Sequence, residues 1–281
     1  MKDTVKSKTL MFKYIIYYIF ILQFFSFEVF SQQLTYYGEL TQGGLIRGKV
    51  EADAEIFLDE KSVKVSKDGF FVFGFGRDHP SNSILIIKYK NGSIQKKLLK
   101  IRSRDWGIQR INNLPSKMVK PSKESLEIIK QNNKEILEAR SIESNETWFL
   151  QEFFWPVKGV VTGIYGTRRV LNGKQMQPHY GIDIAAPKGT EVRAPANGRV
   201  SLAKTDHYYT GGTIILDHGH GLSSAYLHLN KLNVSFGDDI LKGQIIGFVG
   251  STGRSTGDHL DWRINWFKSR IDPQLLVKNK M

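Results

Sequence analysis

The sequence predicts a mainly β protein in which two β-rich regions are joined by a short helical linker. In residues 32–104, short runs of β-branched and aromatic residues are separated by Asp-Gly and Asn-Gly pairs, which favour hairpin turns. In residues 151–281, apolar and polar residues alternate with a period of two in several short segments. Residues 105–150 contain one stretch of helical periodicity. A chain of 281 residues has room for one larger domain and one smaller module.

Residues 1–31 have the features of a secretory signal peptide. Several lysines precede an apolar run at residues 14–27, and Val29-Phe30-Ser31 offers a cleavage point before Gln32. The run is shorter than the roughly 20 residues that a membrane-spanning helix needs. We therefore expect export to the periplasm or cell envelope, with an uncleaved membrane anchor as the alternative. The chain has no cysteine, which permits an oxidising compartment without indicating one.

Within residues 32–104, two turn signals divide the β-rich runs. Asp68-Gly69 precedes a run of four residues, FFVF, and Asn91-Gly92 separates residues 84–88 from residues 93–95. This spacing predicts a small antiparallel sandwich. The pattern resembles the bacterial Ig-like modules that are appended to envelope enzymes. A binding role and a spacer role both remain open.

Residues 121–142 predict an amphipathic helix. Pro121 and Ser122 provide a start signal. The apolar residues that recur at roughly helical spacing are Leu126, Ile129, Ile136 and Leu137. We expect this helix to pack on the C-terminal domain or to join the two domains. An inhibitory lid, formed by the helix or by residues 172–177, is the alternative.

His179 and Asp183 share one face of a predicted strand. Tyr180, Ile182 and Ile184 alternate with them, and this is the period of a strand with one buried face. An offset of four residues would also suit a helix. Glycine and proline crowd the segment, however, and both are unfavourable inside helices.

Two further segments alternate in the same way. Where the chain reads HLDWRI, the apolar residues face a core, and His259, Asp261 and Arg263 turn the other way. Where it reads AYLHL, Tyr226 and His228 lie opposite an apolar series. Each of the three predicted strands therefore offers a side chain that can bind a metal or transfer a proton.

These side chains suit one divalent metal ion with a bound water. A catalytic zinc has about three protein ligands and a fourth position for water, whose pKa it lowers to roughly 7. His179, Asp183 and Asp261 could supply the ligands. His228 and His259 could then take a proton from the water and stabilise an oxyanion. The chain has no HExxH motif and no cysteine for a thiolate site.

Four motifs, in this order and spacing, resemble peptidase family M23, the LytM/lysostaphin-type zinc metallopeptidases. They are GIYGTR at residues 163–168, HxxxD at His179 and Asp183, YLHL at residues 226–229, and GSTGRSTGDHL at residues 250–260. The resemblance covers about residues 153–276. It implies a small antiparallel β domain with His179 and Asp183 as zinc ligands, His259 as general base and His228 as transition-state stabiliser. It also implies an endopeptidase that cleaves peptide crosslinks of bacterial peptidoglycan through a metal-activated water.

The last motif departs from the family pattern. The family closes this motif as HxH, whereas this chain reads HLD, so the third ligand position falls to Asp261. A second carboxylate adds negative charge, and a bound water should then be less acidic. We expect weaker zinc affinity, an activity optimum at higher pH, or a preference for a harder ion such as manganese. A salt bridge between Asp261 and Arg263 is the alternative interpretation of this carboxylate.

The other four histidines, His79 among them, are expected outside the site. His218 and His220 alternate with glycines in DHGHG, which predicts a turn, and the resemblance assigns them no metal role. His207 is expected on a loop that rims the substrate groove.

The net charge is +13, and the chain stays strongly basic without residues 1–31. A basic exported protein is attracted to anionic polymers, and no nucleic-acid-binding motif is present in the sequence. We expect peptidoglycan peptide stems as partners, no nucleic acid, and membrane contact only through an uncleaved N-terminal segment. The alternative function is a catalytically degenerate LytM-like module that binds cell wall or activates an amidase. We prefer the enzyme because decay usually removes several site residues, and only the last ligand position differs here.

Overall fold

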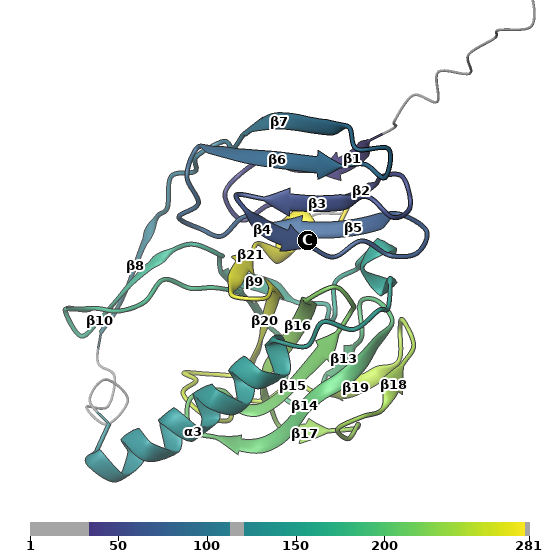
Figure 1. Ribbon diagram of the computed structural model, residues 1–281. Coiled ribbons are helices and arrows are strands. Elements are labelled where there is room, and N and C mark those ends of the chain that lie inside the picture. The colour runs from purple at the N-terminus through teal and green to yellow at the C-terminus, as the bar shows by residue number, and fades with distance from the viewer. Residues whose placement is uncertain (1–33, 113–120, 279–281) are drawn as a thin grey trace, which may run out of the picture. The chain divides into compact units, whose positions relative to one another are not determined.

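The computed structural model describes residues 34–112 and 121–278 (Figure 1). The predicted signal peptide, residues 1–31, lies outside these ranges. The described strands form five sheets, and α3 is the only α-helix within the same ranges. The predicted fold class, mainly β with one helical linker, is therefore confirmed. In the described part of the chain, no helix is both long and apolar enough to span a bilayer.

Two antiparallel sheets form the N-terminal module, with strand orders β1-β2-β5 and β4-β3-β6-β7. Phe71 and Phe73 of one sheet share a core with Ile56 and Ile87 of the other, and all four are essentially buried. These residue types pack well on pleated surfaces, which explains why these runs form strands. The strand bounds are β1 Thr35–Gly38, β2 Leu45–Lys49, β3 Glu55–Leu58, β4 Lys61–Val63, β5 Phe70–Gly74, β6 Asn82–Lys88 and β7 Ile94–Lys100.

Two arginines of this module bind the C-terminal region. The Arg47 Nε donates to the carbonyl oxygen of Phe149, and Arg104 forms a 2.8 Å ion pair with the fully buried Asp272. The module is therefore attached through charged side chains that are largely withdrawn from water.

The linker contributes one strand and the helix. β8 (Ile108–Ile111) pairs in parallel with β10 (Arg168–Leu171), which also pairs with β11 (Lys174–Gln175). α3 (Lys123–Arg140) begins after Ser122, whose hydroxyl accepts a hydrogen bond from the backbone N–H of Ser125. The helix contacts β14 and β15 along one side (Figure 1).

An eight-stranded antiparallel sheet carries the C-terminal domain, in the order β18-β14-β15-β16-β20-β12-β9, with β21 paired to β20. A small sheet, β13-β19-β17, packs beside it. The bounds are β9 Val160–Gly163, β12 Ile182–Ala185, β13 Glu191–Arg193, β14 Gly198–His207, β15 Gly211–Asp217, β16 Leu222–Leu229, β17 Lys231–Leu232, β18 Asp239–Ile240, β19 Ile245–Phe248, β20 His259–Trp266 and β21 Ser269–Ile271, with 3-10 turns η1 Trp148–Leu150 and η2 Pro273–Leu275.

This sheet is buried on both faces, and one prediction is therefore wrong. Tyr226 does not face outward with His228. It is fully buried in the main core, where its strand neighbour is Trp262. The opposite face, with Ala225 and Leu227, packs in a second cluster that includes Ala139 of α3. A period of two separates the two faces of a strand, but it does not say which face is covered by another element.

His179 does not lie on the strand that was predicted to contain it. β12 begins at Ile182, and residues 177–180 are irregular. The backbone of His179 instead exchanges hydrogen bonds with the preceding turn, accepting from Gly166 and donating to Thr167.

Candidate metal centre

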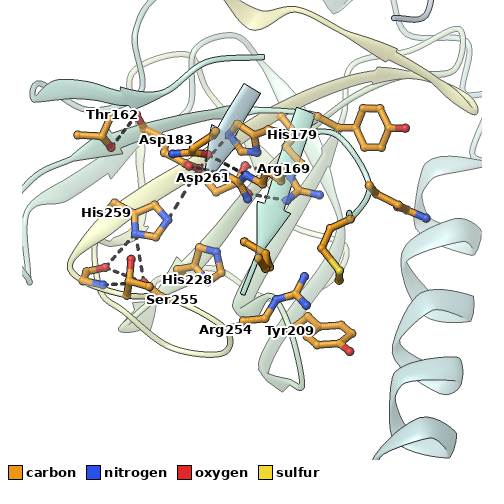
Figure 2. A pocket seen from close by; sticks show the side chains of 18 of the residues that line it. Thr162, Arg169, His179, Asp183, Tyr209, His228, Arg254, Ser255, His259 and Asp261 are labelled. Atoms are coloured by element: carbon orange, nitrogen blue, oxygen red, sulfur yellow. Dashed lines mark hydrogen bonds and ion pairs between the residues drawn. The ribbon is translucent and has the colours of Figure 1, made fainter. Parts of the chain in front are cut away.

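A groove of about 650 Å³ lies where the ends of β12, β16 and β20 meet (Figure 2). His179, Asp183, His228, His259 and Asp261 all line it, so the structure brings every predicted site residue to one place. Its rim comes from segments far away in the sequence, including Gln109 of β8, Asn133 of α3, Tyr209 and Arg254.

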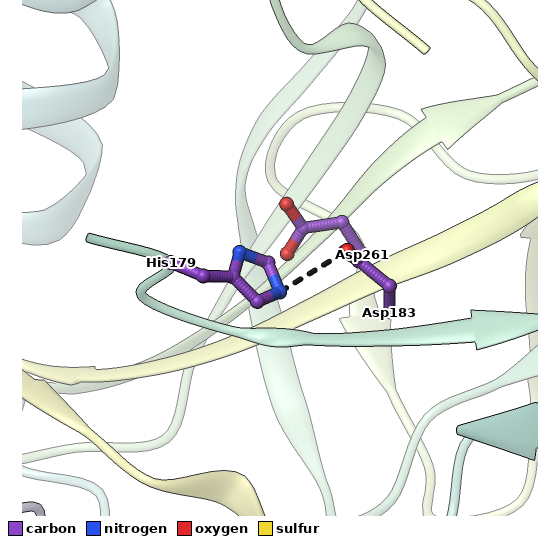
Figure 3. Close-up of side chains that lie close together, drawn as sticks. All are labelled: His179, Asp183 and Asp261. Atoms are coloured by element: carbon purple, nitrogen blue, oxygen red, sulfur yellow. Dashed lines mark ion pairs between the residues drawn. The ribbon is translucent and has the colours of Figure 1, made fainter. Parts of the chain in front are cut away.

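His179, Asp183 and Asp261 form a compact cluster of buried ligand atoms. One ligand atom from each residue lies within 4.8 Å of the others (Figure 3). The two carboxylates come from adjacent strands, because Asp183 of β12 is the direct register partner of Asp261 of β20. The Nε2 atom of His179 is 3.0 Å from the Oδ1 atom of Asp183.

The polar atoms of this cluster fit a bound cation. Both ring nitrogens of His179 and the Oδ1 of Asp183 are buried without a hydrogen-bond partner in the described part of the chain. The 3.0 Å contact between these two residues therefore lacks hydrogen-bonding geometry. Buried polar atoms are rarely left without a partner, so such a group requires an explanation, and a metal ion supplies one. Histidine and carboxylate donors in a set of three suit zinc.

Two glycines leave room for the carboxylates. A Cβ atom at Gly163 would lie 2.2 Å from the Oδ2 of Asp183, and one at Gly181 would lie 2.4 Å from the Oδ1 of Asp261. Neither position accepts a side chain unless a carboxylate moves. The backbone is therefore shaped to hold both groups close together.

Each carboxylate also binds an arginine. The Arg169 Nη2 lies 2.7 Å from the Oδ2 of Asp183. Arg263 binds both oxygens of Asp261, with its Nε 2.9 Å from Oδ1 and its Nη2 in contact with Oδ2. The ion pair between Asp261 and Arg263 that was the alternative interpretation is thus present. Asp261 nevertheless stays within the cluster, because a carboxylate has about four lone-pair sites and the arginine occupies two.

The neighbouring charges keep both carboxylates ionised. Burial acts to raise the pKa of Asp261, but Arg263 and His179 outweigh it and hold that pKa well below its usual range. Burial also opposes ionisation of Asp183, and His179 with Arg169 lowers its pKa below the ordinary value despite the charge of Asp261. Both carboxylates are therefore anionic at neutral pH.

His228 is held in an unusual backbone conformation. Its φ of 64° turns the side chain out of the alternation of β16, toward the groove. Its Nδ1 lies 2.8 Å from the carbonyl oxygen of Thr252, so this nitrogen carries the hydrogen and donates. Burial lowers the pKa of His228 to about 4, which keeps the ring neutral. The Nε2 atom is then left with a lone pair.

His259 has the same hydrogen-bonding arrangement. Its Nδ1 lies 2.9 Å from the carbonyl oxygen of Gly257 and 3.2 Å from the hydroxyl of Ser255. Its Nε2 is 3.8 Å from the Oδ1 of Asp183. The rings of His228 and His259 have centroids 4.8 Å apart, on the same side of the carboxylates (Figure 2). Two proton acceptors therefore stand beside the cluster.

Sequence reasoning missed Arg169, Tyr209 and Arg254. Arg168 and Tyr165 of the GIYGTR motif do not line the groove, and Tyr165 is buried. No local signal distinguishes Arg169 from Arg168. The difference arises from the register of β10, which is set by pairing with a strand of the linker.

The other four histidines, His79 among them, lie outside the groove. His218 and His220 are buried, and their ring nitrogens bind the carbonyl oxygens of Asn197 and Lys64. His207 is also buried, at the end of β14. Its Nε2 lies 3.1 Å from Glu135 of α3, so it is not an exposed loop residue.

Comparisons with known proteins place the domain in a family. Residues 177–273 match the sequence model of peptidase family M23. The peptidoglycan DD-endopeptidase ShyA of Vibrio cholerae is 40% identical over 91 residues, 32% of this chain and 21% of that protein. The DD-carboxypeptidase/endopeptidase Mpg of Neisseria meningitidis is 45% identical over 89 residues, 31% of this chain and 20% of that protein. The chain thus spans about a fifth of the length of these relatives.

A solved structure is similar over most of the chain. The crystal structure of a putative peptidase M23 from Pseudomonas aeruginosa has 26% sequence identity and a TM-score of 0.67, covering 85% of this chain and 95% of that one. The sheet and its histidine–carboxylate cluster define a metallopeptidase type of domain. Residues 177–273 are thus similar to peptidase family M23, as the motifs of this region predicted.

Proposed function

We propose that this protein is a zinc-dependent endopeptidase that hydrolyses peptide crosslinks of bacterial peptidoglycan. The observation that carries the proposal is the convergence of three buried ligand residues, with unpartnered atoms, beside two histidines whose Nε2 lone pairs are available. The name of ShyA, a peptidoglycan DD-endopeptidase, supports this substrate class. Cleavage would take place in the periplasm or cell envelope, to which the N-terminal sequence pattern directs the chain.

His179, Asp183 and Asp261 would hold the ion. When bound, zinc supplies Lewis-acid polarisation of a carbonyl oxygen and lowers the pKa of a water molecule. The charge of the ion would also offset the repulsion between the two opposed carboxylates.

His259 is suited to accept the proton of the attacking water. Its Nδ1–H is held by Gly257, so Nε2 is the acceptor, and the imidazolium that forms would be stabilised by Asp183 at 3.8 Å. The same proton can then be given to the amine that leaves as the peptide bond breaks.

His228 can stabilise an oxyanion only when it holds a proton at Nε2. In its neutral form, Nδ1 carries the only hydrogen and donates it to Thr252. We therefore propose that His228 takes a proton from solvent at Nε2 when substrate binds, donates a hydrogen bond to the developing negative charge, and returns that proton to solvent after the products leave. Its burial opposes the charged form, so only a small fraction of molecules holds this proton before substrate binds.

The deciding experiment uses residues 32–281 with purified crosslinked sacculi. The protein is treated with chelator, reloaded with zinc or manganese, and incubated with sacculi before the soluble muropeptides are resolved. We expect crosslinked dimers to disappear when a metal is present. After chelation, and with Asp183→Ala, the dimers should remain. An unchanged muropeptide profile with every metal and at every pH would instead support the degenerate LytM-like module.

A further inference from the structure

Asp261 is neutralised by an arginine on its own strand. Asp261 and Arg263 are two residues apart on β20, so their side chains project from the same face. The guanidinium binds both carboxylate oxygens, and only 2% of the Asp261 side chain is exposed. A bidentate pair of this kind is directional and fixes the carboxylate as well as its charge.

The position of the carboxylate is constrained from the opposite side too. Gly181 lies so close that a Cβ there would meet the Oδ1 of Asp261 at 2.4 Å and the Cγ of Arg263 at 2.6 Å. The Asp261–Arg263 pair thus fills a space bounded by the backbone of residue 181. The carboxylate has little freedom to rotate away from His179 and Asp183.

Arg263 offsets the repulsion between Asp261 and the neighbouring carboxylate of Asp183. Asp183 is its direct cross-strand neighbour, and like charges in that arrangement repel each other. Arg169 binds Asp183 at 2.7 Å, so the second carboxylate has a cation of its own. Two arginines offset two aspartates before any ion binds. We expected the charge of Asp261 to weaken zinc affinity on the assumption that this carboxylate is unpaired. In the structure it is paired with Arg263.

We propose that Arg263 is a positioning residue that makes Asp261 an effective third metal ligand. The arginine holds the carboxylate where it can reach the ion that His179 and Asp183 would bind, so that the site retains zinc where a histidine is absent. The Asp261–Arg263 pair also has no net charge, like the neutral histidine that it replaces. This inference rests on the proposed function only for the identity of the ion. Its prediction concerns binding of zinc alone, without substrate.

The test is a cycle of four proteins: the wild type, Arg263→Gln, Asp261→His, and the double variant. Zinc affinity of residues 32–281 is measured by chelator competition at one pH, together with the ratio of zinc to manganese affinity. We expect Arg263→Gln to weaken zinc binding about 10- to 100-fold when residue 261 is aspartate, the range typical for lost outer-shell partners. When residue 261 is histidine, the same change should leave zinc affinity unchanged or raise it.

Two further variants test whether a loss of zinc affinity comes only from general destabilisation of the fold. Arg104→Gln breaks another buried arginine–aspartate pair, with Asp272, whose members do not line the groove, and it should leave zinc affinity unchanged. Arg263→Lys keeps the charge but not the two-point contact, and it should recover part of the affinity. If Arg263→Gln does not fold, Arg263→Lys is compared in the aspartate and histidine backgrounds with the same expected difference.

Equal weakening by Arg263→Gln in both backgrounds, or no weakening in the wild-type background, would overturn the inference. The outcome is separable from the fate of the proposed function. A protein that shows this pattern of zinc binding but leaves sacculi intact would keep the role of Arg263 and lose the peptidase proposal. A protein that cleaves sacculi but whose zinc affinity does not depend on Arg263 would keep the peptidase proposal and lose the role of Arg263.

Discussion

Asp183 and Asp261 face each other directly across β12 and β20, in a part of the domain that is withdrawn from water. Two ionised carboxylates in this register repel each other, and the arginines that bind them offset that repulsion. His179, with two unpartnered ring nitrogens, lies beside the pair. The buried atoms that still lack a partner are therefore what a cation would satisfy at this site.

Zinc should stabilise the folded chain because it binds this site. Adding zinc at about 100 times its dissociation constant should raise the free energy of unfolding by about 2.7 kcal/mol, because the ion binds only the folded state. Calorimetry of chelated and reloaded protein measures the change in melting temperature, expected at roughly 2–4 °C per kcal/mol for a chain of this size. Asp183→Asn should abolish most of the increase. An equal increase in that variant would show that the ion binds elsewhere.

Gly181→Ala should impair metal binding. The new methyl group would lie 2.4 Å from the Oδ1 of Asp261 and 2.7 Å from the backbone carbonyl oxygen of Trp262, so the carboxylate and the facing backbone both have to move. We expect a loss of zinc affinity of about tenfold or more, comparable to other disturbances of outer-shell contacts. The measurement is chelator competition. Gly76→Ala is the control, since a Cβ at that position meets nothing within 4 Å and its zinc affinity should match the wild type.

His259→Ala should separate catalysis from metal binding. This histidine is placed to accept a proton and is not a member of the three-residue cluster. We expect hydrolysis of sacculi to fall about 10²- to 10⁴-fold, the usual range for loss of a general base, with bound zinc unchanged. Muropeptide release and metal content are measured on the same preparation. Full activity in the variant would assign the proton transfer to another group, with His228 as the first to examine.

Stability should fall as the pH drops below about 6.5. Burial lowers the pKa of His218 and of His220 to about 4, whereas both titrate near 6.5 when unfolded. Between these values the unfolded chain binds more protons, so the free energy of unfolding decreases with falling pH, by on the order of 3 kcal/mol for each histidine across the whole window.

Denaturant titration of chelated protein between pH 7 and pH 4.5 measures this slope. The double variant His218→Gln, His220→Gln should have a flatter dependence, whatever its absolute stability. An identical slope in the two proteins would mean that other groups control the acid sensitivity.

Much of the domain could be predicted from the sequence because strand alternation and short residue spacings depend only on neighbouring residues. The alternation in HLDWRI correctly placed Leu260, Trp262 and Ile264 in a core and Asp261 on the other face, since the period of a strand depends only on neighbouring residues. The spacing of His179 and Asp183 correctly predicted that the two side chains lie together, even though His179 precedes the strand. An offset of four residues can bring two side chains close in an irregular segment as well as in a strand.

Other features depended on pairing that the sequence does not show. Tyr226 was predicted to face outward, but its face of the sheet packs in the main core, while α3 helps to cover the opposite face with Ala225 and Leu227. Arg169 and Arg168 are adjacent and chemically identical. The parallel pairing of β10 with β8 decides that Arg169 enters the groove.

The sequence by itself determined the type of domain, the ligand residues it offers and the departure at Asp261, because those depend on residue identity and short spacing. Only the tertiary structure decided that Asp183 and Asp261 are opposed, that each is bound by an arginine, and that both histidines present a lone pair to the same groove. These relationships arise from strand register and from hydrogen bonds between residues distant in the chain. Long-range contacts of this kind set the charge and geometry of the site.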